Sequence, residues 1–289
     1  METRRIQRSG TTYYLYLPAS WCREHKITTD STVFLDRSST GNLEVKPKKD
    51  DTTLSSLKLE LTDSNHDVIN KMLIATYINP VKEFGINLTE KLTPDQILGH
   101  KSLLGGLELI DFEESSITCQ TALALSDPDI LLDAMIKKLL RITKLMQQDS
   151  KHELINKYEE EIDKTNLLIH KSIISSLMYR KESKLRHIDL FYIGLISRSI
   201  EQIADLLIAI ENDKPIIKTV ERMITSLSNA LEKITMENAI SFVKEIGKLE
   251  KVQVKNLETY KKKKIYSVFD KIAETLCDWY ITELIDEKH

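Results

Sequence analysis

A helical pattern of apolar residues runs almost without a break from Ser126 to the C-terminus, and it constrains the fold more than any other feature. Ser126-Asp127-Pro128 reads as a helix start, because serine or aspartate caps a first turn and proline is tolerated just inside it. Apolar side chains then recur every three or four residues, which is the spacing of one helix face. Interruptions are expected near residues 149–151, 182–187, 212–215, 235–237 and 260–264. The pattern predicts about six helices in an up-and-down bundle of two three-helix units, 128–213 and 216–287.

The first 122 residues have a different character, with strand and helix signals in alternation. In residues 1–50 we expect a short helix over 18–25 and strands over 12–17, 33–35 and 43–45. In residues 54–122 we expect helices over 67–81 and 94–104, and strands over 85–88, 107–110 and 116–119. The predicted fold class is therefore α+β and mainly α, with domains at 1–50, 54–122 and 126–289.

Composition and charge narrow the class of protein. The chain has 289 residues and a formal net charge of -3, so a role based on non-specific nucleic-acid binding would need a local basic patch. Its cysteines are widely separated, which favours free thiols over a zinc site or disulfides. The first residues are polar and basic, and no run of 18 apolar residues occurs. We expect a cytoplasmic protein without a signal peptide and without direct membrane insertion.

Two pairs of acidic residues in the helical region suggest a binding site. Glu201 and Asp205 lie four residues apart on a helix that is apolar nearly all round, where unpaired carboxylates would be costly. Glu159 and Asp163 have the same spacing on the preceding helix, beside its apolar stripe. On antiparallel neighbours the two pairs would converge four carboxylates, a ligand set for Fe, Mn, Mg or Zn. Alternatively, residues 159–161 are a solvated acidic run and Arg198 neutralises Glu201.

The same segments resemble a known family. Arg198-Ser-Ile-Glu201-Gln-Ile-Ala-Asp205 resembles the signature helix of PhoU proteins, and Glu159-Glu-Glu-Ile-Asp163 resembles its companion motif. The resemblance implies a metal site formed by Glu159, Asp163, Glu201 and Asp205 on the bundle surface. It also implies a regulator of phosphate uptake and homeostasis, which senses metal or a transporter or sensor-kinase partner.

A third acidic pair occurs in the last helix. Glu274 and Asp278 repeat the four-residue spacing, but the neighbouring helix offers only Glu245 in the corresponding stretch. The sequence therefore predicts a second metal site there only weakly. The basic tract 261–264 is interpreted as a solvated turn.

The N-terminus carries a small basic patch. Residues 1–50 contain nine Lys/Arg against six Asp/Glu, and Arg4, Arg5, Gln7 and Arg8 could contact phosphates and base edges. The pattern Arg5-Ile-Gln-Arg8-Ser-Gly-Thr-Thr-Tyr13, followed by Leu17-Pro-Ala-Ser-Trp21, resembles the AbrB/SpoVT type of swapped-hairpin domain. That resemblance implies a homodimer that presents its basic residues to DNA, although some copies of this domain serve only to dimerise.

Three hypotheses about function follow from these observations. The sequence shows no P-loop, nucleophile elbow or dinucleotide loop, and its seven histidines are dispersed, so a non-enzymatic regulator leads. A metal-dependent phosphohydrolase and a dimeric scaffold that does not bind DNA are the alternatives. Residues 54–122 could act as a spacer or as a ligand sensor.

Overall fold

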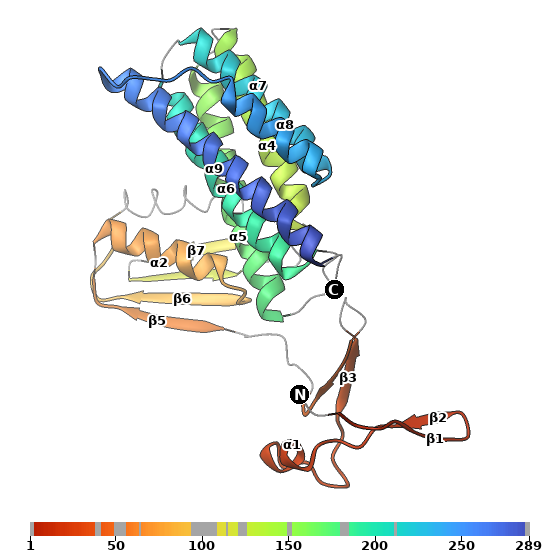
Figure 1. Cartoon of the computed structure of the whole chain (residues 1–289). Helices are drawn as coiled ribbons and strands as arrows, with labels where there is room; N and C mark the ends of the chain where they lie inside the picture. The colour runs from red at the N-terminus through yellow and green to blue at the C-terminus, as the bar shows by residue number, and fades with distance from the viewer. Residues whose placement is uncertain are drawn as a thin grey trace. The chain divides into compact units, whose positions relative to one another are not determined.

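The computed structural model describes residues 3–37, 42–48, 56–63, 65–93, 109–113, 115–120, 126–148, 152–179, 185–210 and 213–286. The chain divides into two compact units, Met1–Thr52 and Thr53–His289. Most described residues are helical and the sheets are small, which confirms the mainly helical α+β class (Figure 1). The predicted helix over 94–104 lies outside the described residues.

The N-terminal unit contains two separate hairpins and a short helix. Its elements are β1 (Gln7–Ser9), β2 (Thr12–Tyr14), α1 (Ala19–Glu24), β3 (Phe34–Arg37) and β4 (Leu43–Lys46). Ser9 pairs with Thr12 across a two-residue turn, and Gly10 adopts φ +60 there, which glycine does without a steric penalty. β3 and β4 also pair antiparallel. No residue of this unit whose exposure is described is buried.

The second unit begins with a small α/β subdomain. Its elements are β5 (Leu57–Leu61), α2 (His66–Ile78), β6 (Glu83–Leu88), β7 (Leu109–Phe112) and β8 (Ser116–Gln120). The sheet order is β5-β6-β8-β7, with β5 parallel to β6 through the α2 crossover and the other pairs antiparallel. Asn65 caps α2 by accepting a hydrogen bond from the Asp67 amide over 2.9 Å. Ile69, Phe84 and Ile117 are fully buried in the core of this subdomain.

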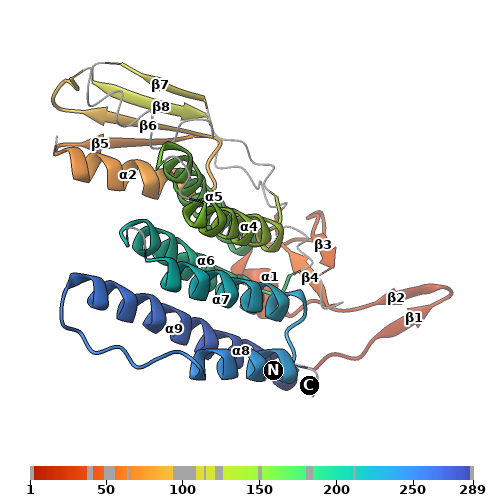
Figure 2. The ribbon, with the colours of Figure 1, turned by 90° about the horizontal axis from the view of Figure 1, so that it is seen from above.

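Six helices of the described chain form the bundle. They are α4 (Pro128–Gln147), α5 (His152–Tyr179), α6 (His187–Ile208), α7 (Lys214–Glu232), α8 (Met236–Gly247) and α9 (Leu257–Asp286). α6 and α7 lie between the pair α4/α5 and the pair α8/α9 (Figure 2). The sequence predicts an apolar stripe on α5 at Ile155, Tyr158, Ile162, Ile169 and Ile173. The four isoleucines are buried, and Tyr158 is half-buried against the same core.

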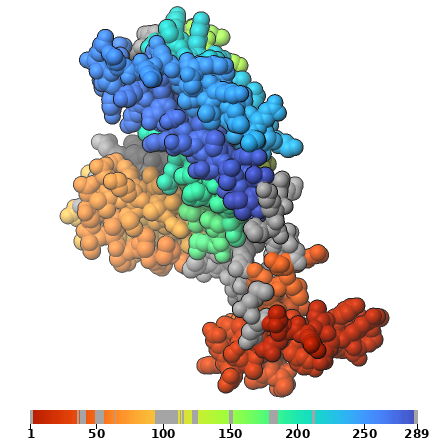
Figure 3. Space-filling model, in the orientation of Figure 1, coloured from red at the N-terminus to blue at the C-terminus, as the bar shows by residue number. Residues whose placement is uncertain are grey.

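The subdomain packs directly against the bundle. α2 contacts α5, and Leu167 and Leu168 of α5 lie against the subdomain core. Lys171 of α5 is fully buried, and its Nζ lies 4.1 Å from the centroid of the Tyr77 ring on α2. In the space-filling view the orange atoms of the subdomain meet the green atoms of α5 (Figure 3). α5 is therefore shared between the subdomain core and the bundle.

The predicted helix break over 260–264 is wrong. α9 runs continuously from Leu257, and the connection from α8 lies between Gly247 and Leu257. Lysine is a good helix former whose stem can lie along the helix surface. Lys262 pairs with Glu250, and Lys261 Nζ donates to the Ala209 carbonyl over 2.6 Å, at the end of α6. These basic residues thus cap and anchor helices instead of forming a turn.

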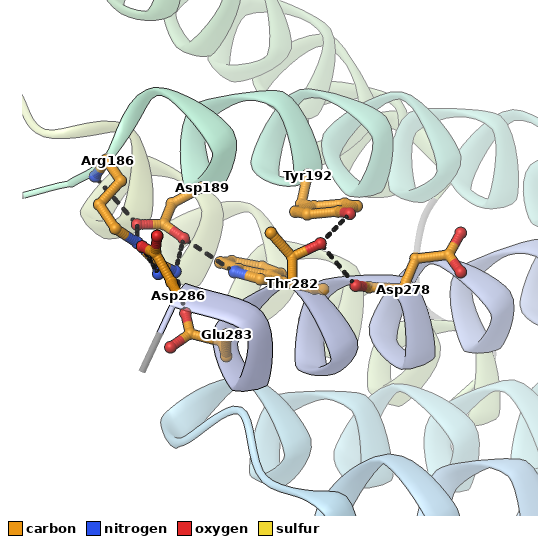
Figure 4. Close-up of polar contacts among 8 residues, drawn as sticks. Arg186, Asp189, Tyr192, Asp278, Thr282, Glu283 and Asp286 are labelled. Atoms are coloured by element: carbon orange, nitrogen blue, oxygen red, sulfur yellow. Dashed lines mark hydrogen bonds and ion pairs between the residues drawn. The ribbon is translucent and has the colours of Figure 1, made fainter. Parts of the chain in front are cut away.

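A network of polar contacts ties the start of α6 to the end of α9 (Figure 4). Asp189 accepts hydrogen bonds from the backbone amide of Arg186 over 2.9 Å and from its guanidinium. The Arg186 guanidinium also pairs with Glu283 and Asp286 near the end of α9. The contacts fix the N-terminal end of α6 against the C-terminal end of α9.

Candidate metal centre

A polar seam lies along the contact between α5 and α6. Glu159, Asp163, Asn166 and His170 recur at steps of four, three and four residues, so they share one face of α5. The helices run antiparallel, because Arg198 Nε donates to His170 Nε2 over 3.2 Å while Gly194 lies beside Ile173. A Cβ at position 194 would stand 3.3 Å from Ile173 Cδ1, so glycine permits this close approach. This register sets Asp205 opposite Asp163, while Glu201 lies about one turn further along the seam toward His170.

Three of the four predicted ligands come together. Glu159, Asp163 and Asp205 each offer a carboxylate oxygen, and these oxygens all lie within 4.8 Å of one another. Glu159 and Asp163 are half-buried, whereas Asp205 is exposed. Glu201 stands outside that group of three, yet its charge acts on Asp163. Among the described residues no other group of three acidic, histidine or cysteine side chains brings its ligand atoms so close.

The electrostatics of the seam show an excess of negative charge. Burial, followed by the charges of Glu159, Asp205 and Glu201, raises the pKa of Asp163 to about 7. Burial and then Asp205 raise the pKa of Glu159. Burial and its acidic neighbours also raise the pKa of Glu201, against the opposing charge of Arg198, and burial raises that of Asp205. A cation among these oxygens would relieve both their desolvation and their mutual repulsion.

One ligand atom is left without a donor. Asp163 Oδ1 is buried and has no hydrogen-bond partner. Buried carboxylate oxygens normally accept hydrogen bonds or coordinate a metal ion. The chemistry of this donor set therefore fits a hard or borderline cation such as Mg²⁺, Mn²⁺, Fe or Zn²⁺.

The alternative interpretation of the acidic residues holds only in part. Glu160 and Glu161 are exposed, and Glu161 pairs with Lys138 at 3.4 Å, as expected for a solvated run. Glu159 instead belongs to the seam. The charge of Arg198 favours ionisation of Glu201, but burial and acidic neighbours outweigh it. Arg198 therefore compensates Glu201 incompletely.

The third acidic pair forms no comparable cluster among the described residues. Glu274 and Asp278 are both exposed on α9. Glu245 of α8 pairs instead with Lys248 and, at 3.4 Å, with Arg222. The carboxylates at this end of the chain are therefore not brought together as those of α5 and α6 are.

The predicted DNA-contacting residues lie at or just before β1, and all are exposed. Arg4 and Arg5 precede the strand. Gln7 Oε1 accepts a hydrogen bond from the Tyr16 hydroxyl over 3.2 Å. Arg8 Nε donates to the Gly10 carbonyl over 2.9 Å, and its guanidinium lies 5.6 Å from the Tyr13 ring centroid. Local contacts therefore hold Gln7 and Arg8 against the first hairpin.

Sequence reasoning missed the continuation of the seam beyond the acidic pairs. Asn166 and His170 extend the stripe of Glu159 and Asp163 along α5. Their helical spacing was a usable signal, but only the contact between His170 and Arg198 reveals that they face α6.

No known protein family, curated protein or solved structure matches this chain. None of the described helices combines the length and the apolar character needed to cross a membrane. The seam, the N-terminal unit and the two resemblances in the sequence are therefore the features that bear on function.

Proposed function

We propose that this chain is a cytoplasmic, metal-binding regulator of phosphate uptake and homeostasis, similar to PhoU proteins in its helical part. One observation carries the proposal. The carboxylate oxygens of Glu159 and Asp163 on α5 and of Asp205 on α6 lie within 4.8 Å of one another, and α5 and α6 are the two helices that contain the PhoU-like motifs. Glu201, the other acidic residue of the α6 motif, supplies the fourth carboxylate. Nothing in the seam requires a catalytic role, so we propose a binding protein and not an enzyme.

A metal ion at this position would join α5 to α6. Because α5 also packs against α2 through Tyr77 and Lys171, the site is mechanically linked to the α/β subdomain. Asp205 is exposed, so the bound ion would remain within reach of a transporter or sensor-kinase partner. Metal occupancy could in this way alter the surface that a partner recognises.

The N-terminal unit is proposed to be completed by a second copy of the chain. None of its residues with a described exposure is buried, and a unit of this size is rarely stable without a shared core. Its exposed large apolar side chains are Ile6, Tyr13, Tyr14, Leu15, Tyr16, Phe34, Leu35 and Leu43. Contact with a second copy would bury them, in line with the AbrB/SpoVT resemblance. Arg4, Arg5, Gln7 and Arg8 would then present a doubled basic patch to DNA.

Metal content is the first test. Full-length protein purified without chelator should contain Fe, Mn, Mg or Zn by elemental analysis, and Asp205→Ala should lose most of it. Asp133→Ala is a matched control, because Asp133 is exposed on α4 and pairs only with Lys137 in the contacts described here. Equal metal content in Asp205→Ala and wild type would contradict the proposed site.

Dimerisation and DNA binding need a separate experiment. Sedimentation should show a dimer that Leu15→Asp weakens, whereas Ile130→Asp, at an apolar residue on α4 that is also exposed, should leave the dimer intact. Gel-shift titrations should show salt-sensitive DNA binding that the Arg4→Ala/Arg5→Ala double variant reduces. A monomeric wild type would remove the dimer. DNA binding that is independent of salt or of these arginines would contradict the proposed DNA role.

The hydrolase alternative has its own test. Phosphoester turnover that Glu201→Ala abolishes would favour a hydrolase over a binding protein.

A further inference from the structure

Asn166 follows Glu159 and Asp163 on the same face of α5 and is not one of the motif residues. It follows Asp163 by three positions on α5, so it lies one turn further along the same face. Asn166 Oδ1 is buried and has no hydrogen-bond partner. A neutral amide oxygen in this position needs a donor or a cation.

Asp163 likewise has a buried side-chain oxygen that lacks a hydrogen-bond donor. Its Oδ1 is also buried without a partner, so two neighbouring turns of α5 each direct an unsatisfied oxygen acceptor into the interior. The coincidence matters because buried acceptors without partners are uncommon, and the described residues contain few of them. A single cation between the two turns would satisfy both oxygens and would also compensate the negative charge of the neighbouring carboxylates, which a neutral hydrogen-bond donor such as water would not do.

The next polar group along the seam, the imidazole of His170, is already engaged in a hydrogen bond and does not offer its Nε2 lone pair to such a cation. His170 Nε2 already accepts a hydrogen bond from Arg198 Nε over 3.2 Å, so its lone pair is occupied. The remaining groups of the seam that can donate to a metal are carboxylate and amide oxygens. Oxygen ligands favour hard cations, whereas imidazole would favour Zn²⁺ and later transition metals.

We infer that Asn166 Oδ1 is a further ligand of the cation site and that, with Glu159, Asp163, Glu201 and Asp205, it makes an oxygen-only site for a hard divalent cation. The inference rests on the proposed function, because it assumes that the carboxylates bind metal. It adds a neutral ligand, which contributes to coordination without adding to the negative charge already present.

Binding of Mn²⁺ to the full-length protein tests the inference, since free Mn²⁺ can be measured by electron paramagnetic resonance. Asn166→Ala should weaken Mn²⁺ binding by at least about tenfold, the lower end of the effect known for residues that support a metal site. Asn166→Asp should retain binding because it keeps an oxygen at the same position. Asn156→Ala is the matched control, since Asn156 is exposed on the same helix.

A second variant separates loss of a ligand from loss of the fold. Asn166→Leu removes the oxygen but fills the buried space, and circular dichroism should show native helix content while Mn²⁺ affinity falls as in Asn166→Ala. Wild-type affinity in either folded variant would overturn the inference. If Asp163→Asn nonetheless abolished binding in the same assay, the proposed metal site would stand without Asn166. A wild type that bound Zn²⁺ but no Mn²⁺, Mg²⁺ or Fe²⁺ would overturn this inference alone, and a wild type that bound none of the four ions would overturn both proposals.

Discussion

Trp279 Nε1 donates a hydrogen bond to Asp189 Oδ1 over 2.9 Å, although 90 positions separate the two residues in the chain. Asp189 also accepts hydrogen bonds from Arg186, so one carboxylate joins the start of α6 to α9 (Figure 4). Burial of Asp189 opposes its ionisation, but these hydrogen bonds outweigh burial and hold its pKa below the usual value. The charged form of Asp189 is therefore the one that stabilises the fold.

Replacing Asp189 by alanine should destabilise the bundle. The change leaves the Trp279 indole and part of the Arg186 guanidinium without partners in a largely buried setting. We expect a loss of about 3 kcal/mol in the free energy of unfolding, measured by urea denaturation. Asp133→Ala should change it by less than about 1 kcal/mol, because the Asp133–Lys137 pair is exposed. An equal decrease in the free energy of unfolding for Asp189→Ala and Asp133→Ala would show that Asp189 has no special role in stability.

The pH dependence of stability should report on Asp163. Its pKa is raised to about 7 in the folded protein, so between the unfolded value and 7 the folded state holds a proton that the unfolded state lacks. Stability then falls as pH rises through that range, because the charged carboxylate is disfavoured only in the fold. His170 acts in the opposite direction below its ordinary pKa, since burial and Arg198 lower its pKa to about 4. The effect of Asp163 is thus clearest above pH 6.5.

Metal-free wild type should lose about 1 kcal/mol of stability between pH 6.5 and 8 through Asp163 alone. Asp163→Asn cannot ionise at this position, so its stability should depend less on pH over the same interval. Urea denaturation in the presence of chelator measures the difference between the two proteins. Parallel pH profiles would show that Asp163 does not titrate in this range, and saturating Mn²⁺ should flatten the wild-type profile.

Much of the bundle could be predicted because apolar periodicity is a local signal. The buried stripe from Ile155 to Ile173 follows directly from residue spacing, as does the placement of Glu159 and Asp163 beside it. Which helix faces that stripe is a tertiary property, and it depends on contacts such as that between Ile173 and Gly194. The acidic pairs were therefore predictable as pairs, whereas their approach within one site required the fold.

The differences between the predicted and the observed elements have identifiable physical causes. A run of like charge at 261–264 predicts a solvated turn, yet lysine propagates a helix well and α9 runs through the tract. β1 has no apolar alternation, so its residues alone do not predict a strand. β5 alternates leucine with charged residues, and this alternation is a strand signal in the sequence. The burial of one atom, Asn166 Oδ1, has no signature in the sequence.

Gly194 should be sensitive to the size of its side chain. A Cβ at this position already meets Ile173 Cδ1 at 3.3 Å, so leucine would force α5 and α6 apart. We expect Gly194→Leu to lower the free energy of unfolding by about 1–3 kcal/mol and to weaken metal binding. Gly247→Leu is the control, since no atom lies within 4 Å of a Cβ at that position. If Gly194→Leu bound metal with wild-type affinity, the spacing of α5 and α6 would not determine the site.

Arg198 should control which metal the seam prefers. Removing its guanidinium with Arg198→Met frees His170 Nε2, which lies one turn beyond Asn166 on α5. Imidazole favours Zn²⁺ more than Mn²⁺, so the ratio of Zn²⁺ to Mn²⁺ affinity should rise by at least about tenfold. The ratio is the informative quantity, because loss of the positive charge should strengthen binding of both ions. Competition titrations of the full-length protein measure it, and the double variant Arg198→Met/His170→Leu should return the ratio to the wild-type value. If the double variant kept the raised ratio, the added preference for Zn²⁺ would come from a group other than His170.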